Sequence, residues 1–284
     1  MRVPFKAGLF YIFFGVKENL VHTVRVGDIE MEYARIGTGP KPLIVIPGLS
    51  IKSVMNSAAS LEVPYKVFKE DYTLYFFDRK KNIAPGYSLR QMADDQAAAM
   101  LALGIENAAV FGVSQGGMVA QYLAIHYPQL VGKLVLGSSS YKPEPMQLEV
   151  IGNWARLAEA HDSRGLVDSF IEKCFSEKFL ARYRRPLLAM YAEVSDEEMD
   201  RFAILAHACD EVDTVEQLSK IQCPVLVLGA GDDRVLSAEA SVKIVDKLKN
   251  SGVRCEFYMY EGYGHAVFDE LRDYKDRIYA FLQG

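Results

Sequence analysis

The stretch "VFGVSQGGMVAQ", residues 110–121, decides the fold. An apolar run stops at Ser114, which stands among small residues, and a helical pattern follows it. A serine at a tight strand-to-helix turn needs strained backbone geometry, and Gly112 and Gly116 remove side chains that would collide with neighbouring elements. The G-x-S-x-G spacing predicts that the Oγ of Ser114 stands clear of a sheet at a helix N-terminus, where N–H groups favour negative charge. A helix N-cap serine with packing glycines is the alternative interpretation of these five residues.

Strand and helix patterns alternate on both sides of this turn. Residues 21–36 alternate apolar and polar side chains around Gly27 and Asp28, which predicts an antiparallel hairpin. Short apolar runs at 43–46 and 72–77 predict strands buried on both faces, and further strands are expected at 107–113, 133–139, 224–230 and 255–260. Helical patterns cover 58–69, 88–104, 116–128, 238–249 and 269–282. The alternation predicts an α/β fold, with a mainly parallel sheet and helices on both faces.

The alternation breaks once, between two strands of the predicted core. From residue 141 to residue 218 the pattern is helical throughout, and strand-like runs are missing. We therefore expect residues 1–140 and 219–284 to form the core and residues 141–218 to form an inserted helical cap.

Composition excludes several classes of protein. The chain has 284 residues, a formal net charge of -5 and no long basic block, so we expect no nucleic-acid partner. Its four cysteines, Cys174, Cys209, Cys223 and Cys255, have no metal-binding spacing. We expect free thiols, no metal and a cytoplasmic location, because free thiols persist in a reducing compartment.

The N-terminal region carries an apolar run at residues 7–16, preceded by Arg2 and Lys6. This outline resembles a secretory signal, but no small-x-small cleavage site follows the run. The run is also shorter than the roughly 20 residues that span a bilayer, so stable membrane insertion is not expected. We predict that it is buried against its own domain or in a homodimer contact.

A serine hydroxyl needs a base, and the base needs a partner that fixes its tautomer. Of the five histidines, His265 alone follows a predicted strand in a glycine-flanked loop, "GYGHAVFDE". That loop would open on the same carboxyl edge of the sheet as Ser114. Two adjacent carboxylates, Asp232 and Asp233, follow the strand at 224–230, and either could be the partner.

Three segments together resemble the α/β-hydrolase superfamily in its compact form with a helical cap. These segments are "GVSQGG", "PVLVLGAGDDRVLSAEAS" and "GYGHAVFDE", and the similarity extends over nearly the whole chain from about Val24. The resemblance implies the order nucleophile Ser114, acid Asp233 and base His265, since the family pattern matches "DRVLSAEAS" from its first residue. Asp232 remains the alternative acid.

The resemblance also implies an oxyanion hole and a function. The backbone N–H groups of Leu49 and Gln115 are the implied donors, although Pro47 stands where the family usually has histidine. The implied reaction is cleavage of a small, mostly apolar carboxylic ester through an acyl-enzyme, without a cofactor. Thioester, amide or carbon-carbon bond hydrolysis and perhydrolysis use the same residues and remain alternatives, and a non-catalytic binding protein is a third possibility.

Overall fold

The computed structural model describes residues 20–284. The apolar run at residues 7–16, for which we predict a covered position, lies outside these residues. Within the part of the chain that is described, no helix is both long and apolar enough to cross a membrane. The homodimer and the cytoplasmic location stay predictions.

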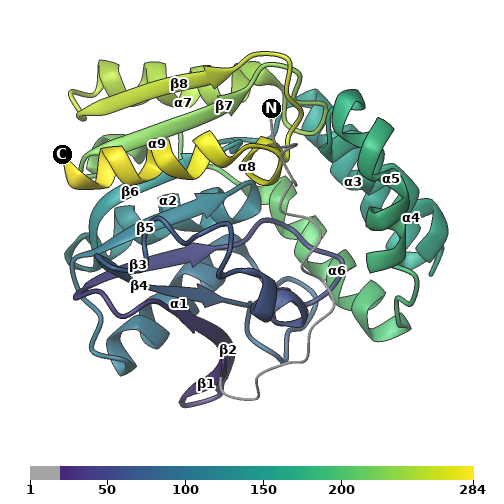
Figure 1. The fold of residues 1–284 in the computed structure, drawn as a ribbon, viewed down its shortest axis with the longest axis horizontal. Helices are drawn as coiled ribbons and strands as arrows, with labels where there is room; N and C mark the ends of the chain where they lie inside the picture. The colour runs from purple at the N-terminus through teal and green to yellow at the C-terminus, as the bar shows by residue number, and fades with distance from the viewer. Residues whose placement is uncertain (1–19) are drawn as a thin grey trace, which may run out of the picture.

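An eight-stranded sheet forms the centre of the molecule (Figure 1). Its order is β1-β2-β4-β3-β5-β6-β7-β8. Strands β1 and β2 form the predicted hairpin, β2 pairs antiparallel with β4, and the remaining neighbours are parallel. The strands are β1 (Val21–Val26), β2 (Ile29–Ile36), β3 (Lys41–Ile46), β4 (Tyr72–Phe77), β5 (Ala108–Val113), β6 (Val131–Gly137), β7 (Val225–Ala230) and β8 (Cys255–Tyr260). The predicted α/β fold with a mainly parallel sheet is confirmed.

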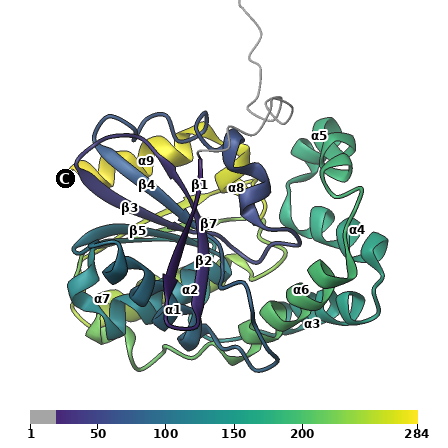
Figure 2. The same cartoon turned by 90° about the horizontal axis from the view of Figure 1, so that it is seen from below.

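Helices cover both faces of the sheet (Figure 2). One face carries α1 (Leu89–Ala102), α2 (Gln115–His126) and α7 (Ala238–Asn250), and the other carries α8 (Val267–Glu270) and α9 (Arg272–Gln283). Alternate residues of β3 divide between the two cores, so Ile44 and Ile46 face α1 and α2 while Leu43 and Val45 face α9. A capping box at Ser88 and Gln91 starts α1 where the sequence predicts it.

The predicted helix at residues 58–69 is wrong in type and position. The chain forms the 3-10 helix η2 (Val54–Ser60) and then a series of turns up to residue 71. Pro64 lies within the expected helix, where it has no N–H to donate and its ring would clash with the carbonyl of the preceding turn. The predicted final helix is likewise divided, because Leu271 adopts an extended conformation between α8 and α9.

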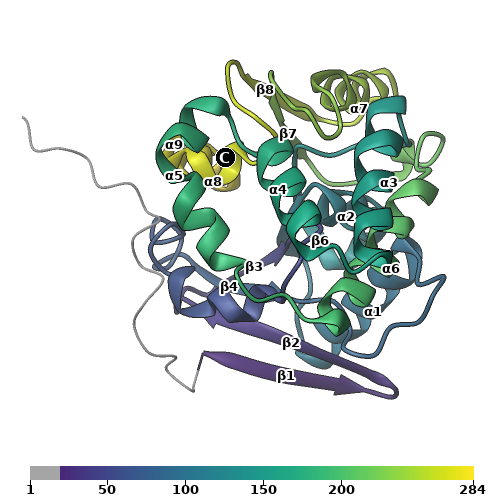
Figure 3. The ribbon, with the colours of Figure 1, turned by 90° about the vertical axis from the view of Figure 1, so that its right-hand side faces the viewer.

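Between β6 and β7 the chain forms four long helices and no strand among residues 141–218. They are α3 (Pro145–Glu159), α4 (Ser163–Cys174), α5 (Glu177–Met190) and α6 (Asp196–Ala208). The short 3-10 helices η4 (Cys209–Glu211) and η5 (Leu218–Lys220) follow α6, whereas η3 (Pro128–Leu130) precedes β6. The four helices lie together at one end of the sheet (Figure 1), and Figure 3 looks onto them from that end. Trp154 of α3 and Phe202 of α6 are among their fully buried side chains.

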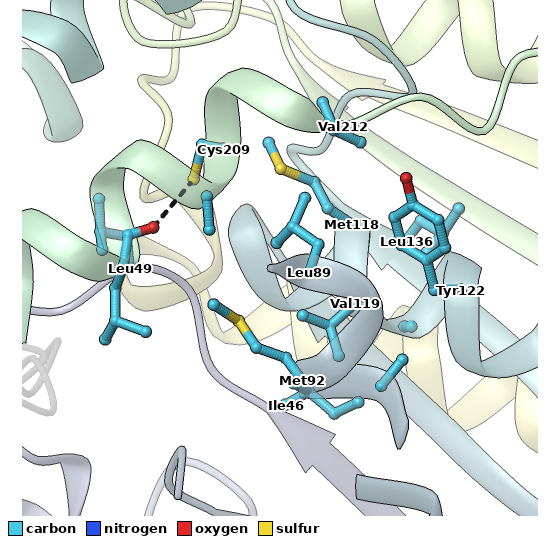
Figure 4. Packing of buried hydrophobic residues seen from close by; sticks show 14 of the residues in the cluster. Ile46, Leu49, Leu89, Met92, Met118, Val119, Tyr122, Leu136, Cys209 and Val212 are labelled. Atoms are coloured by element: carbon cyan, nitrogen blue, oxygen red, sulfur yellow. Dashed lines mark hydrogen bonds between the residues drawn. The ribbon is translucent and has the colours of Figure 1, made fainter. Parts of the chain in front are cut away.

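The core continues from the sheet into this helical segment. Figure 4 shows Met118 and Tyr122 of α2 close to Val212, which follows α6 in the chain. Leu49 and Cys209 belong to the same buried cluster. The helical segment is therefore packed against the elements that hold Ser114.

Candidate active site

The turn between β5 and α2 holds Ser114 in a rare backbone conformation, with φ 53° and ψ -122°. Such a positive φ is unfavourable for a residue with a side chain, and it directs the serine out of the path of the strand. A Cβ at Gly112 would overlap the carbonyl oxygen of Gly116, and a Cβ at Gly116 would overlap the carbonyl oxygens of Ile46 and Pro47. Both glycines are therefore required by close backbone contacts.

Three side chains from separate loops form a hydrogen-bonded series at the carboxyl edge of the sheet. The Nε2 atom of His265 lies 2.9 Å from the Oγ of Ser114, and its Nδ1 atom lies 2.7 Å from the Oδ2 of Asp233. All three side chains are buried. Since Nδ1–H faces a carboxylate, Nε2 carries the lone pair that can accept the proton of Ser114.

The carboxylate of Asp233 has no freedom to turn away from His265. Its other oxygen, Oδ1, accepts hydrogen bonds from the backbone N–H groups of Val235 at 2.8 Å and Leu236 at 2.9 Å. Asp232 is exposed, and its backbone N–H donates to the carbonyl of Tyr263. Of the two adjacent acids, the structure thus brings Asp233 to the histidine.

The other four histidines have different partners. The ring of His22 stacks on Tyr33, and the ring of His126 stacks on Tyr122. His161 contacts Asp200, and His207 contacts Glu159. His265 is accordingly the histidine that the fold places beside the serine.

The two predicted oxyanion donors belong to segments that lie next to Ser114. A Cβ added to Gly48 would be 3.1 Å from the Cβ of Ser114, so the loop that carries Leu49 passes directly beside the serine. Gln115 is the first residue of α2. Within residues 20–284, neither backbone N–H has a hydrogen-bond partner. Free N–H groups at this position, one of them at a helix N-terminus, can stabilise a developing oxyanion.

A buried arginine that the sequence analysis did not identify connects the two sides of this site. The Nη2 atom of Arg79 donates to the carbonyl of Pro47 at 2.8 Å and to Oε1 of Gln115 at 3.3 Å. The Nε2 atom of Gln115 donates in turn to the carbonyl of Leu205 in α6. Burial lowers the pKa of Arg79, while the nearby charge of Asp78 opposes this shift. The signal in the sequence was the charged pair Asp78-Arg79 directly after a buried strand.

The helical segment also contacts the loops that carry the acid and the histidine. The backbone N–H of Ala266, next to His265, donates to the carbonyl of Cys174 at 2.7 Å. Arg234, next to Asp233, donates to the carbonyls of Glu172 at 2.6 Å and Phe175 at 2.9 Å. The end of α4 is therefore fixed to both loops.

Residues 20–284 contain no group of three or more histidine, cysteine, aspartate or glutamate side chains that could hold a metal ion. Cys174, Cys209 and Cys223 are buried, and Cys255 is half-buried. The absence of a cofactor remains a prediction.

The fold and this arrangement of side chains define the class of α/β hydrolases. Residues 88–272 match the family model described as serine aminopeptidase, S33, and the chain belongs to this family. The AB hydrolase superfamily protein YisY of Bacillus subtilis is 27% identical over 84% of this chain and 89% of its own length. The 3-oxoadipate enol-lactonase 2 of Acinetobacter baylyi is 22% identical over 75% of this chain and 79% of its own length.

Solved structures show the same fold. The crystal structure of the enol-lactonase from Burkholderia xenovorans LB400 matches 93% of this chain and 100% of its own, with a TM-score of 0.79 and 18% identity. The chain is thus a hydrolase of the α/β-hydrolase fold.

Proposed function

We propose that the protein is a serine hydrolase that cleaves small, mostly apolar carboxylic esters through an acyl-enzyme. The continuous series from Ser114 through His265 to Asp233, at 2.9 Å and 2.7 Å, carries this proposal. These distances lie within the range over which a nucleophile and its base exchange a proton. A protein that only binds a ligand does not need the three groups in contact.

In the first half of the reaction, the Oγ of Ser114 attacks the ester carbonyl carbon while its proton passes to Nε2 of His265. The carbonyl π electrons move to oxygen, which becomes an oxyanion bound by the N–H groups of Leu49 and Gln115. When the intermediate collapses, the bond to the alkoxy group breaks and His265 returns its proton to the leaving alcohol. Asp233 stabilises the imidazolium throughout and keeps its own charge.

In the second half, water replaces the alcohol. His265 takes a proton from the water as its oxygen attacks the acyl carbon, and a second oxyanion forms in the same hole. Its collapse breaks the bond to Ser114, whose oxygen regains the proton from His265. The products are one carboxylic acid and one alcohol, and the enzyme returns to its starting state.

Residues 141–218 are proposed to be a cap that encloses the substrate, inserted into a core made of residues 1–140 and 219–284. The contacts of Leu205 with Gln115 and of Cys174 with Ala266 support a position above the nucleophile and the histidine. A cap that excludes water strengthens the electrostatic interactions in the site. A site covered in this way would admit small-molecule substrates.

The choice of an ester over other acyl bonds is supported by the relatives. A lactone is an internal ester, and an enol-lactonase is among the relatives of this chain. Thioester, amide and carbon-carbon bond cleavage and perhydrolysis would use the same three residues, and a series of substrates with different bonds separates them.

The test combines active-site labelling with a substrate series. A fluorophosphonate should label the wild type and not the Ser114→Ala variant, because the phosphonate reacts with the activated hydroxyl. Chromogenic acetate, butyrate and octanoate esters should be hydrolysed faster than the thioester and anilide of the same acyl group. Equal labelling of Ser219→Ala and wild type is the matched control, since Ser219 is an exposed serine whose Oγ donates only to the carbonyl of Glu216. Undiminished labelling of Ser114→Ala would disprove the mechanism, and faster cleavage of an amide or thioester would replace the ester assignment.

A further inference from the structure

A small cavity lies beside the oxyanion hole, between the core and helix α6. It has a volume of about 90 Å³ and is bounded by the loop after β3, the end of β4, and α6. Gly48 and Gln115 form part of its wall, and Gly48 also lies against Ser114. Gly48 therefore borders both the cavity and the proposed nucleophile.

The cavity has more positive than negative side chains. Lys52, Arg79 and Arg201 line it, together with Asp78 and Glu198. Both acids already accept hydrogen bonds. Asp78 accepts from the Oγ of Ser53 and the backbone N–H of Arg79. Glu198 accepts from the backbone N–H of Ser195, the N-cap residue of α6. Arg201 uses its donors on the carbonyls of residues 79–81.

Two cationic donors at this cavity lack a partner. Within residues 20–284, neither Nε nor Nη1 of Arg79 forms a hydrogen bond, since both bonds of the guanidinium come from Nη2, and the residue is only 6% exposed. Lys52 is half-buried and forms no ion pair or hydrogen bond with its side chain in the same part of the chain. A buried guanidinium with an unused N–H is costly, and an anion within reach would offset that cost.

We propose that this cavity is the subsite for a carboxylate group of the substrate. The cavity has the volume of about three water molecules. A carboxylate group and the carbon next to it can fill a space of this size. A planar carboxylate offers two acceptor oxygens, one for Arg79 and one for Lys52. The assignment rests on the proposed ester hydrolysis and narrows it, since the apolar substrate then carries one acidic group close to the scissile bond.

Binding of an anion is measured first, on the Ser114→Ala variant, which does not require any turnover. Acetate and acetamide have nearly the same shape and differ in charge, so they are titrated at constant ionic strength while the melting temperature is recorded. Acetate should raise the melting temperature saturably, and acetamide should not. In a Lys52→Gln background the acetate affinity should fall about tenfold, because a charge-assisted hydrogen bond is lost. The matched Lys66→Gln change, at an exposed lysine outside the cavity, should leave it unchanged.

Substrate preference is measured second, on enzyme with Ser114 intact. Mono-4-nitrophenyl glutarate, whose carboxylate is on the acyl group, is compared with its methyl ester. Likewise, 3-acetoxybenzoate, whose carboxylate is on the leaving phenol, is compared with its methyl ester. In one of the pairs the anionic ester should have the higher kcat/KM by about tenfold, and Lys52→Gln should remove this preference while Lys66→Gln keeps it.

The outcomes separate the two proposals. Equal shifts of the melting temperature with acetate and with acetamide would overturn the anion subsite. Equal acetate affinities of the Lys52→Gln and Lys66→Gln variants would overturn it as well. Acetate binding without a preference in either ester pair would overturn its assignment to the substrate. Acetate binding with no turnover of any ester would count against the proposed hydrolysis and leave the anion site standing.

Discussion

Replacing Asp233 by asparagine should disable the enzyme through the tautomer of His265. The Oδ1 atom of Asp233 accepts two backbone N–H groups, at 2.8 Å and 2.9 Å, and these would hold the amide oxygen of an asparagine in the same place. The NH₂ group of the amide must then face Nδ1 of His265, where Oδ2 lies 2.7 Å away in the wild type. An NH₂ group donates, so Nδ1 must become the acceptor and the ring proton moves to Nε2.

The consequence is a histidine that can no longer act as a base toward Ser114. With its proton on Nε2, His265 presents a donor to the serine oxygen 2.9 Å away. We expect kcat to fall about 10⁴-fold, which corresponds to about 5 kcal/mol of transition-state stabilisation, with little change in KM. The fold should persist, because the asparagine keeps both backbone hydrogen bonds.

The assay is steady-state hydrolysis of a chromogenic ester at neutral pH, with circular dichroism and thermal melting to verify folding. Asp232→Asn is the matched control, since Asp232 is exposed and the hydrogen bond of its backbone N–H does not depend on the side chain. A folded Asp233→Asn enzyme with a kcat within tenfold of wild type, or a larger loss in Asp232→Asn, would refute this account of the acid.

Three further predictions test the nucleophile, the turn and the buried thiols. Ser114→Ala and His265→Ala should each lower kcat for ester hydrolysis by about 10³-fold or more, with no additive effect in the double variant, because the residues act as a unit. Gly116→Ala should lower the free energy of unfolding in urea by about 3 kcal/mol, since the new Cβ would overlap two backbone carbonyls. Gly152→Ala in α3, where the nearest atom is 3.8 Å away, should instead raise it by about 0.5 to 1 kcal/mol. Burial raises the pKa of Cys209 to about 12, so iodoacetamide at pH 8 should modify this thiol only after unfolding, as followed by mass spectrometry; rapid labelling of the folded protein would contradict its buried position.

The residues around Ser114 show how much local sequence determines. The turn at Ser114 is determined by residues close to it in the sequence, namely the apolar run of β5, the two glycines and the helical pattern of α2. Steric rules that apply to neighbouring residues are therefore sufficient to predict it. The same holds for α1, whose capping box and apolar spacing lie within the helix. The alternation of strands and helices then restricts the sheet to a mainly parallel one.

Positions that depend on distant partners could be proposed from the sequence only by family resemblance. Asp232 and Asp233 have the same chemistry and adjacent places, and the direction in which the β7 loop turns decides which one meets a histidine 32 residues further along. The strand order β2-β4-β3 likewise departs from chain order, because pairing is chosen by how whole strands pack.

The environment of Arg79 was decided by the tertiary structure alone. Its guanidinium joins Pro47 to Gln115, which are 32 residues before it and 36 residues after it, and a cavity beside it is closed by Arg201 of α6. No periodicity or motif links these positions, since the cost of burying a charge depends on which groups the fold brings within hydrogen-bonding distance. Sequence thus determined the turn at Ser114 and the order of the elements around it, whereas long-range packing decided which acid contacts His265 and left the Nε atom of Arg79 without a hydrogen bond.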